Sequence, residues 1–269
     1  MTSNAAADVR EESLMRGGFA GPLDSAADYI RRSALWLVPA YVLAAGPLIA
    51  VAVPAISAIM ERDAMAAQFY AVIMVPALIW RWAGLALIQS RVFGELSGKQ
   101  PAFIWKRMGP ILALRMVLAP LAIWGMFLMV APSLAAMSAA TLTAPLLLDG
   151  PDAGFRQVAK LFRYSVARGR AIWLAGFLLA AFLILSAMIF GVLQLLQSFV
   201  FPALLGISDA RISMVVNSGA MNLGLDLLVF LLLDLLWCIA GVILYLELDA
   251  SRTGTDLRIR LQALLEAVD

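Results

Sequence analysis

Residues 223–246 read LGLDLLVFLLLDLLWCIAGVILYL, a stretch in which only Asp226 and Asp234 are charged. A helix of about 20 apolar residues is long enough to cross the roughly 30 Å hydrocarbon core of a bilayer. The stretch therefore predicts a membrane-spanning helix and indicates that the chain is an integral membrane protein.

The rest of the chain has the same character. Of its 269 residues, 63% are hydrophobic and 14% are charged, whereas soluble domains have roughly 45–50% apolar and about 25% charged residues. We expect an all-α bundle of six transmembrane helices. The six apolar runs cover residues 35–60, 69–88, 111–130, 133–148, 172–199 and 223–246. The fourth run is short and rich in Ala, Ser and Thr, so we expect it to pack closely among other helices.

The basic residues predict the orientation of this bundle. The N-terminal segment, the loops after the second and fourth runs and the C-terminal segment hold sixteen of the twenty Lys and Arg residues, whereas the opposite loops hold only Arg62 and Arg211. Positive residues of short loops are retained on the cytoplasmic side. Without the span at 133–148 the later segments would change sides, and the distribution would fall to nine against nine. Charge placement thus favours six spans, with both termini on the cytoplasmic side of the membrane.

Three parts follow from this reading. Residues 1–34 form a cytoplasmic segment with an amphipathic helix at 24–32 and lack the apolar run of a signal peptide. Residues 35–250 form the six-span domain, and residues 251–269 form a cytoplasmic tail. Further amphipathic helices are expected in the interface at 101–107 and 153–170, because apolar and basic residues recur there at helical spacing.

The basic residues of these amphipathic segments are the candidates for contact with lipid headgroups or a partner. They are Arg31, Arg32, Lys106, Arg107, Arg156, Lys160, Arg163 and Arg170. Each basic residue near an anionic membrane surface contributes about 1 kcal/mol to binding. The same residues would also serve simply to anchor the bundle and set its topology, and the sequence leaves both interpretations open.

Four ionisable residues lie inside the apolar runs, where charges are costly and are usually paired or line a wet cavity: Arg81, Arg115, Asp226 and Asp234. Counted from the outer ends of their runs, Arg81 lies about 13 Å deep and Asp234 about 18 Å deep, so these two could form an ion pair. Asp226 lies nearer the outer face, and Arg115 is expected to extend toward the cytoplasmic headgroups. The cluster is either an interhelical clamp or part of a proton or substrate pathway.

Rare residues limit the chemistry of the chain. It contains no histidine, and Cys238 is its single cysteine. Zinc sites, dithiol redox pairs and Ser-His-Asp or Cys-His nucleophiles all need residues that are absent. We therefore expect no catalytic residues, no metal site and no cofactor. A nucleic-acid partner is not expected either, because the basic residues lie beside spans and not on a soluble domain.

Four short stretches resemble a known family. They are residues 91–101 (RVFGELSGKQP), 144–153 (APLLLDGPDA), 168–173 (RGRAIW) and 244–257 (LYLELDASRTGTDL). Together they resemble the six-helix bacterial membrane domain that is attached to some glycerophosphodiester phosphodiesterases and also occurs alone. The last stretch departs from the family pattern at Glu247-Leu248-Asp249, where the family has an acidic residue, Leu and Arg. No catalytic residue is carried over, because the resemblance does not extend to the phosphodiesterase domain.

The resemblance implies a six-span protein of the bacterial inner membrane with an accessory role in assembly, scaffolding or maintenance of the envelope. We therefore expect a non-enzymatic scaffold or accessory subunit that binds membrane lipids and a partner membrane protein, or forms a homo-oligomer. The alternative is a small secondary transporter or permease that uses Arg81, Asp226 and Asp234. Pro39, Pro47 and Pro54 in the first run are compatible with this alternative, since interrupted helices build many transporter sites.

Overall fold

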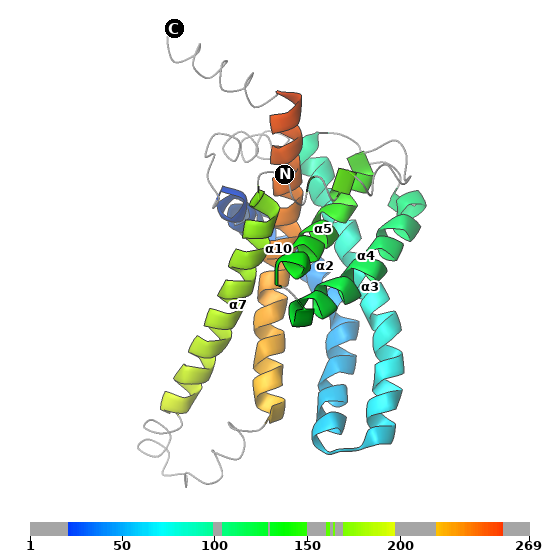
Figure 1. Cartoon of the computed structure of the whole chain (residues 1–269), viewed down its shortest axis with the longest axis vertical. Coiled ribbons are helices and arrows are strands. Elements are labelled where there is room, and N and C mark those ends of the chain that lie inside the picture. The colour runs from blue at the N-terminus through cyan, green and yellow to red at the C-terminus, as the bar shows by residue number, and fades with distance from the viewer. Residues whose placement is uncertain are drawn as a thin grey trace. The chain divides into compact units, whose positions relative to one another are not determined.

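The computed structural model describes residues 21–98, 104–128, 130–149, 160–161, 164, 169–196 and 219–254. Its main elements are six α-helices (Figure 1): α2 (Gly21–Met60), α3 (Ala64–Ser97), α4 (Ile104–Leu128), α5 (Val130–Asp149), α7 (Arg170–Leu195) and α10 (Gly219–Thr253). The part of the chain that is described contains no strand, so the predicted all-helical fold is confirmed there. Four of the helices, α2, α3, α7 and α10, are long and apolar enough to cross a membrane.

Each of the six helices begins before the apolar run that predicted it. Residues 24–32, expected as a separate interfacial helix, are the first turns of α2 and continue without a break into residues 35–60. Lys106 and Arg107 likewise lie in the first turns of α4. Most of the predicted amphipathic helix at 153–170, with Arg156 and Arg163, lies outside the described residues. These helices begin before the apolar runs because polar residues at helix ends are compatible with helical geometry.

A tight turn joins α2 to α3. The Asp63 N–H donates to Ala58 O at 2.9 Å, and the Arg62 N–H donates to Ile59 O at 3.2 Å. This is the Schellman pattern, which places one residue in the left-handed region, and Arg62 has a φ of 58°. Asp63 then caps α3, since its Oδ1 accepts from the N–H groups of Met65 and Ala66 at 3.1 and 3.0 Å. Local hydrogen bonds thus both end α2 and begin α3.

The chain packs as two compact units. Unit 1 comprises Met1–Ala44, Trp82–Gly176 and Leu235–Asp269, and unit 2 comprises Ala45–Arg81 and Phe177–Asp234. The four long helices contribute residues to both units, whereas α4 and α5 belong entirely to unit 1. The helices α4 and α5 are therefore the two main helices that lie within a single unit.

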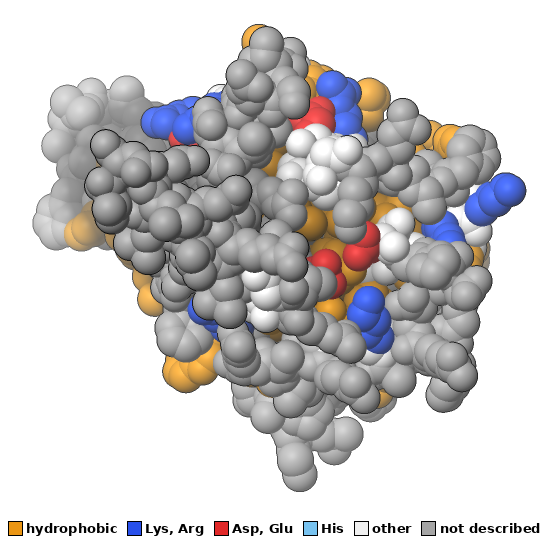
Figure 2. Space-filling model, turned by 90° about the horizontal axis from the view of Figure 1, so that it is seen from above, with side chains coloured by type: hydrophobic (Ala, Val, Ile, Leu, Met, Phe, Trp, Pro, Cys, Tyr) orange, Lys and Arg blue, Asp and Glu red, His pale blue; other side chains and the backbone are white. Residues whose placement is uncertain are grey.

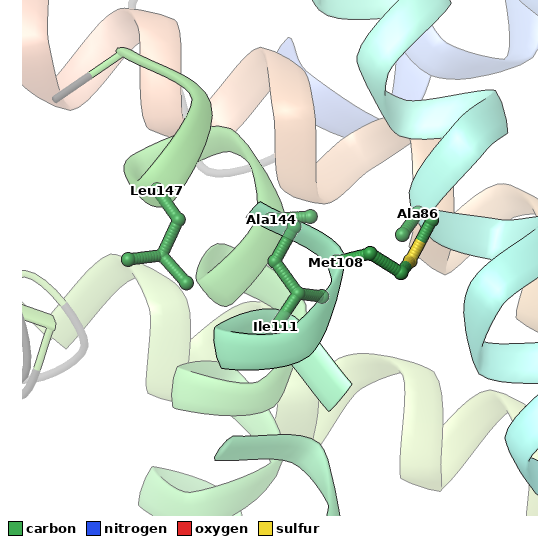
Figure 3. Close-up of a cluster of buried hydrophobic side chains, with 5 residues drawn as sticks. All are labelled: Ala86, Met108, Ile111, Ala144 and Leu147. Carbon is green, nitrogen blue, oxygen red and sulfur yellow. The ribbon is translucent and has the colours of Figure 1, made fainter. Parts of the chain in front are cut away.

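A cluster of buried hydrophobic side chains lies in unit 1. Ala86 of α3 packs there with Met108 and Ile111 of α4 and with Ala144 and Leu147 of α5. Figure 3 shows the Met108 side chain extending from α4 toward Ala86. The beginning of α4 and the end of α5 therefore lie together beside the same part of α3.

Small residues allow two close helix contacts within unit 1. A side-chain carbon on Gly84 of α3 would collide with Ala44 of α2. One on Gly241 of α10 would collide with the Thr141 side chain of α5. Glycine is required where backbones approach this closely, as at many helix contacts in membrane proteins. Gly84 and Gly241 thus set the separation of α2 from α3 and of α5 from α10.

Candidate functional site

An ion pair within unit 2 joins α3 to α10. Arg81 Nη2 lies 2.6 Å from Asp234 Oδ1, and the side chains are only 7% and 14% exposed. The Arg81 guanidinium also lies over the Phe230 ring, 5.1 Å from its centroid, within the range of a cation–π interaction. The structure thus brings together the two residues that the depth argument paired. Asp226 is half-buried, and it forms no ion pair with any residue that the structure describes.

A second buried polar group lies in unit 1 around Gln89 of α3, which is 1% exposed. Its Nε2 donates to Cys238 O of α10 at 3.0 Å and to Thr141 O of α5 at 3.4 Å. Its Oε1 accepts from Arg115 Nη2 of α4 at 2.6 Å, and Arg115 Nη1 donates to Trp82 O at 2.9 Å. One side-chain amide therefore connects four helices. We call Gln89, Arg115 and Thr141 the polar centre.

Pro145 accounts for one contact of the polar centre. Proline has no N–H, so the carbonyl four residues earlier in a helix loses its usual donor. In α5 that carbonyl belongs to Thr141, and Gln89 supplies the missing donor. The Thr141 hydroxyl donates to Met137 O at 2.8 Å and accepts from Trp237 Nε1 of α10. Neighbouring helices commonly satisfy groups freed by proline in this way in membrane proteins.

The structure corrects one expectation and adds one residue. Arg115 does not extend toward the headgroups, because it is 6% exposed and its guanidinium lies in the polar centre. Gln89 was not among the candidates, since a neutral side chain one position past the predicted run at 69–88 gives no charge signal. The only sequence signal was Pro145, which shows that a carbonyl needs a donor without showing which residue provides it.

A third group of polar contacts lies in unit 1 near the C-terminal ends of α5 and α10. The Tyr245 hydroxyl donates to Asp149 Oδ2 at 2.8 Å, and the Tyr164 hydroxyl donates to Asp249 Oδ1 at 3.3 Å. Arg170 Nη1 lies 3.5 Å from Glu247 Oε2. Arg170, a candidate for lipid contact, is therefore engaged within the protein. Lys160 is half-buried, with its Nζ 5.6 Å from the centroid of the Tyr164 ring.

Other basic candidates lie at the protein surface. The Arg31 side chain is 80% exposed, and both Arg31 and Arg32 form ion pairs with Asp28, at 2.7 and 2.6 Å. Lys106 is exposed beside the exposed Trp105, and Arg107 is half-buried. On the face seen in Figure 2, the Lys and Arg side chains of the described residues appear as separate groups.

The described residues define a helical protein with four helices suited to crossing a membrane, in which Gln89 contacts Arg115 and Arg81 contacts Asp234. No family model matches the chain, and no curated protein or solved structure is significantly similar to it. Within the described ranges, no group of three or more Cys, Asp or Glu side chains is placed to hold a metal ion, and Cys238 is buried.

Proposed function

We propose that this protein is a non-enzymatic scaffold or accessory subunit of the bacterial inner membrane. In this proposal it binds a partner membrane protein or a second copy of itself, contacts anionic lipid and has both termini in the cytoplasm. The observation that carries the proposal is the direct contact between Arg81 and Asp234. The resemblance to the membrane domain of glycerophosphodiester phosphodiesterases also favours an accessory role.

The ion pair suits a structural role better than a transport role. A carboxylate on a proton or substrate pathway must exchange its partner during each cycle. Asp234 is 14% exposed and lies 2.6 Å from the guanidinium of Arg81. Removing one partner of a buried pair costs about 3–5 kcal/mol, because it leaves an uncompensated buried charge. The pair therefore resists cycling and holds α3 against α10.

The proposed lipid contact depends on the exposed basic residues. Arg31 and Lys106 lie near the N-terminal ends of α2 and α4, and Trp105 precedes Lys106. Tryptophan is enriched at membrane interfaces, and basic residues are enriched on the cytoplasmic side. Their placement supports an interface at these helix ends, where anionic headgroups would meet the side chains.

The proposal is tested by affinity purification of the tagged full-length protein from its native membranes in a mild detergent. We expect a stoichiometric partner protein or a homo-oligomer, together with bound anionic phospholipid. Purification as a lipid-free monomer, even after cross-linking in the membrane, would contradict the proposal. Substrate uptake by reconstituted vesicles that is abolished by Asp234→Asn would support the transporter instead.

The proposed contact with anionic lipid can be tested with a matched control variant. The double variant Arg31→Ala/Lys106→Ala should retain several-fold less anionic lipid than the unchanged protein, because it loses two exposed charges on the predicted cytoplasmic side. Arg62→Asn removes a charge from the predicted opposite side, and asparagine tolerates the left-handed conformation there. Equal lipid loss in Arg62→Asn would show that general charge, and not these residues, determines retention.

A further inference from the structure

The helices α4 and α5 each lie within one compact unit, whereas the other four helices are divided between two units. The prediction of six spans needs both of them to cross the membrane. Among the residues that the structure describes, the stretches long and apolar enough to cross lie in α2, α3, α7 and α10, and these four helices are shared between the two units. All of α4 and α5 belongs to unit 1.

Contacts with α7 locate the beginning of α5. The Ser138 hydroxyl of α5 lies 2.8 Å from Ala171 O, in the first turn of α7. Four residues nearer the start of α5, Leu134 Cδ1 would lie 3.8 Å from a side-chain carbon on Gly176. The two helices are therefore antiparallel here, with the start of α5 pointing along α7 away from Arg170.

Helix geometry converts this register into a depth. Gly176 lies about 9 Å along α7 from Arg170, at 1.5 Å per residue. Val130, the first residue of α5, is at most about 6 Å beyond Leu134 by the same rise. The start of α5 is therefore about 15 Å from the beginning of α7, whereas α7 continues as one helix for about 39 Å. This distance is less than half the length of α7.

The other ends of the two helices meet. Met108 and Ile111, early in α4, share a hydrophobic cluster with Ala144 and Leu147, late in α5. Asp149, the last residue of α5, accepts a hydrogen bond from Tyr245 in the C-terminal part of α10. The two helices thus form an antiparallel hairpin that opens toward the beginning of α7 and the end of α10. In Figure 1, α4 and α5 lie side by side and oblique to the adjacent part of α10.

We propose that α4 and α5 form a re-entrant hairpin, which enters and leaves the membrane on one side and turns near the middle of the bilayer. The chain then crosses the membrane four times. The side of the membrane from which the hairpin enters rests on the proposed function, which makes it the cytoplasmic side. A hairpin that returns to its own side leaves the sixteen basic residues together, so the charge distribution agrees with this topology as well as with six spans.

The burial of α5 supports this assignment. Its described side chains, residues 133–149, are all buried or half-buried. Re-entrant segments occur at membrane depth only where protein or a water-filled cavity covers them. The hydroxyls of Ser133, Ser138 and Thr143 are bonded to carbonyls of Ala122, Ala171 and Ala139. By contrast, most of the large side chains of α7, such as Phe177, Leu183 and Met188, are exposed.

Single-cysteine labelling in the full-length protein tests the hairpin. A membrane-impermeant maleimide is applied to intact spheroplasts and to inverted vesicles carrying Glu61→Cys, Lys106→Cys or Leu128→Cys, with Cys238→Ala as background. We expect labelling of Glu61→Cys from outside only, of Lys106→Cys from inside only, and of Leu128→Cys from neither side. Labelling of all three in denaturing detergent shows that each thiol is reactive. Labelling of Leu128→Cys from the Glu61 side would overturn the hairpin and support six spans.

An insertion experiment distinguishes a turn inside the membrane from an external loop that is merely covered by other residues. A ten-residue Gly/Ser-rich polar segment between Leu128 and Val130 should abolish recovery of folded protein, whereas the same insertion between Glu61 and Arg62 should leave recovery unchanged. Normal recovery of the first insertion, with its segment cleaved by external protease, would refute the hairpin. Reversed labelling of Glu61→Cys and Lys106→Cys, with Leu128→Cys still protected, would overturn the proposed orientation and leave the hairpin standing.

Discussion

Gln89 combines hydrogen bonds to three helices other than its own, and its side chain is almost fully buried. Arg81, Arg115 and Asp234 stand out in the sequence as charges within apolar runs, whereas the neutral amide of Gln89 does not. The contact of Arg81 with Asp234 agrees with the depth estimate, because two rigid helices of known rise set the levels of their residues. The surroundings of Arg115 were not predicted, since they depend on the tilt of α4 and on the carbonyl freed by Pro145.

Replacement of Gln89 should destabilise the protein. Gln89→Leu removes the acceptor for Arg115 and the donor for the carbonyls of Thr141 and Cys238. Leaving buried polar groups unsatisfied costs about 1–3 kcal/mol. Thermal unfolding in detergent micelles should show this loss, and Gln68→Leu, at an exposed position of the same helix, should not. Equal stability of the two variants would show that the polar centre contributes nothing.

The contact at Gly241 makes a second prediction at the residue scale. In Gly241→Ala the new methyl group collides with the Thr141 side chain, and overpacking of this kind costs about 1–3 kcal/mol. Gly224→Ala, where a methyl group meets no neighbour, is the matched control and should unfold like the unchanged protein. Thr141→Ser removes the colliding methyl group, so it should restore part of the stability of Gly241→Ala. Failure of this rescue would contradict the proposed contact.

At the scale of the elements, the apolar runs predicted where helices occur, because the hydropathy of a run depends only on local sequence. They did not predict the helix ends. Residues 24–32 have the pattern of an interfacial helix, yet they continue directly into the first apolar run within α2. Whether such a segment bends into the interface or continues the helix depends on its packing partners. Here Tyr29 of α2 donates to Glu95 of α3 at 2.6 Å, which holds the segment against α3.

The cap of α3 yields a prediction at this scale. Asp63→Ala removes the side-chain acceptor for the N–H groups of Met65 and Ala66. The loss of an N-cap costs about 1 kcal/mol, so the unfolding temperature should fall slightly. Asp63→Ser retains a capping oxygen and should unfold like the unchanged protein. A fall of the same size in Asp63→Ser would indicate that the charge, and not the cap, is responsible.

For the whole molecule, composition and charge placement predicted a membrane protein with six crossings. They could not distinguish two further spans from a hairpin that returns to its own side, because both arrangements place the same loops together. The two arrangements differ in how far α5 extends along α7. That register depends on contacts at Ser138 and Gly176, which the hydropathy of the sequence does not reveal. The number of crossings is therefore a property of tertiary packing in this protein.

The central claim is that the charges at membrane depth hold helices together. A double-mutant cycle on Arg81 and Asp234, followed by thermal unfolding of the purified protein, tests it most directly. Arg81→Ala and Asp234→Ala should each lose about 3–5 kcal/mol, because each leaves a buried charge without its partner. The double variant should lose markedly less than the two single losses combined. Losses that simply add, or single variants as stable as the unchanged protein, would contradict the claim.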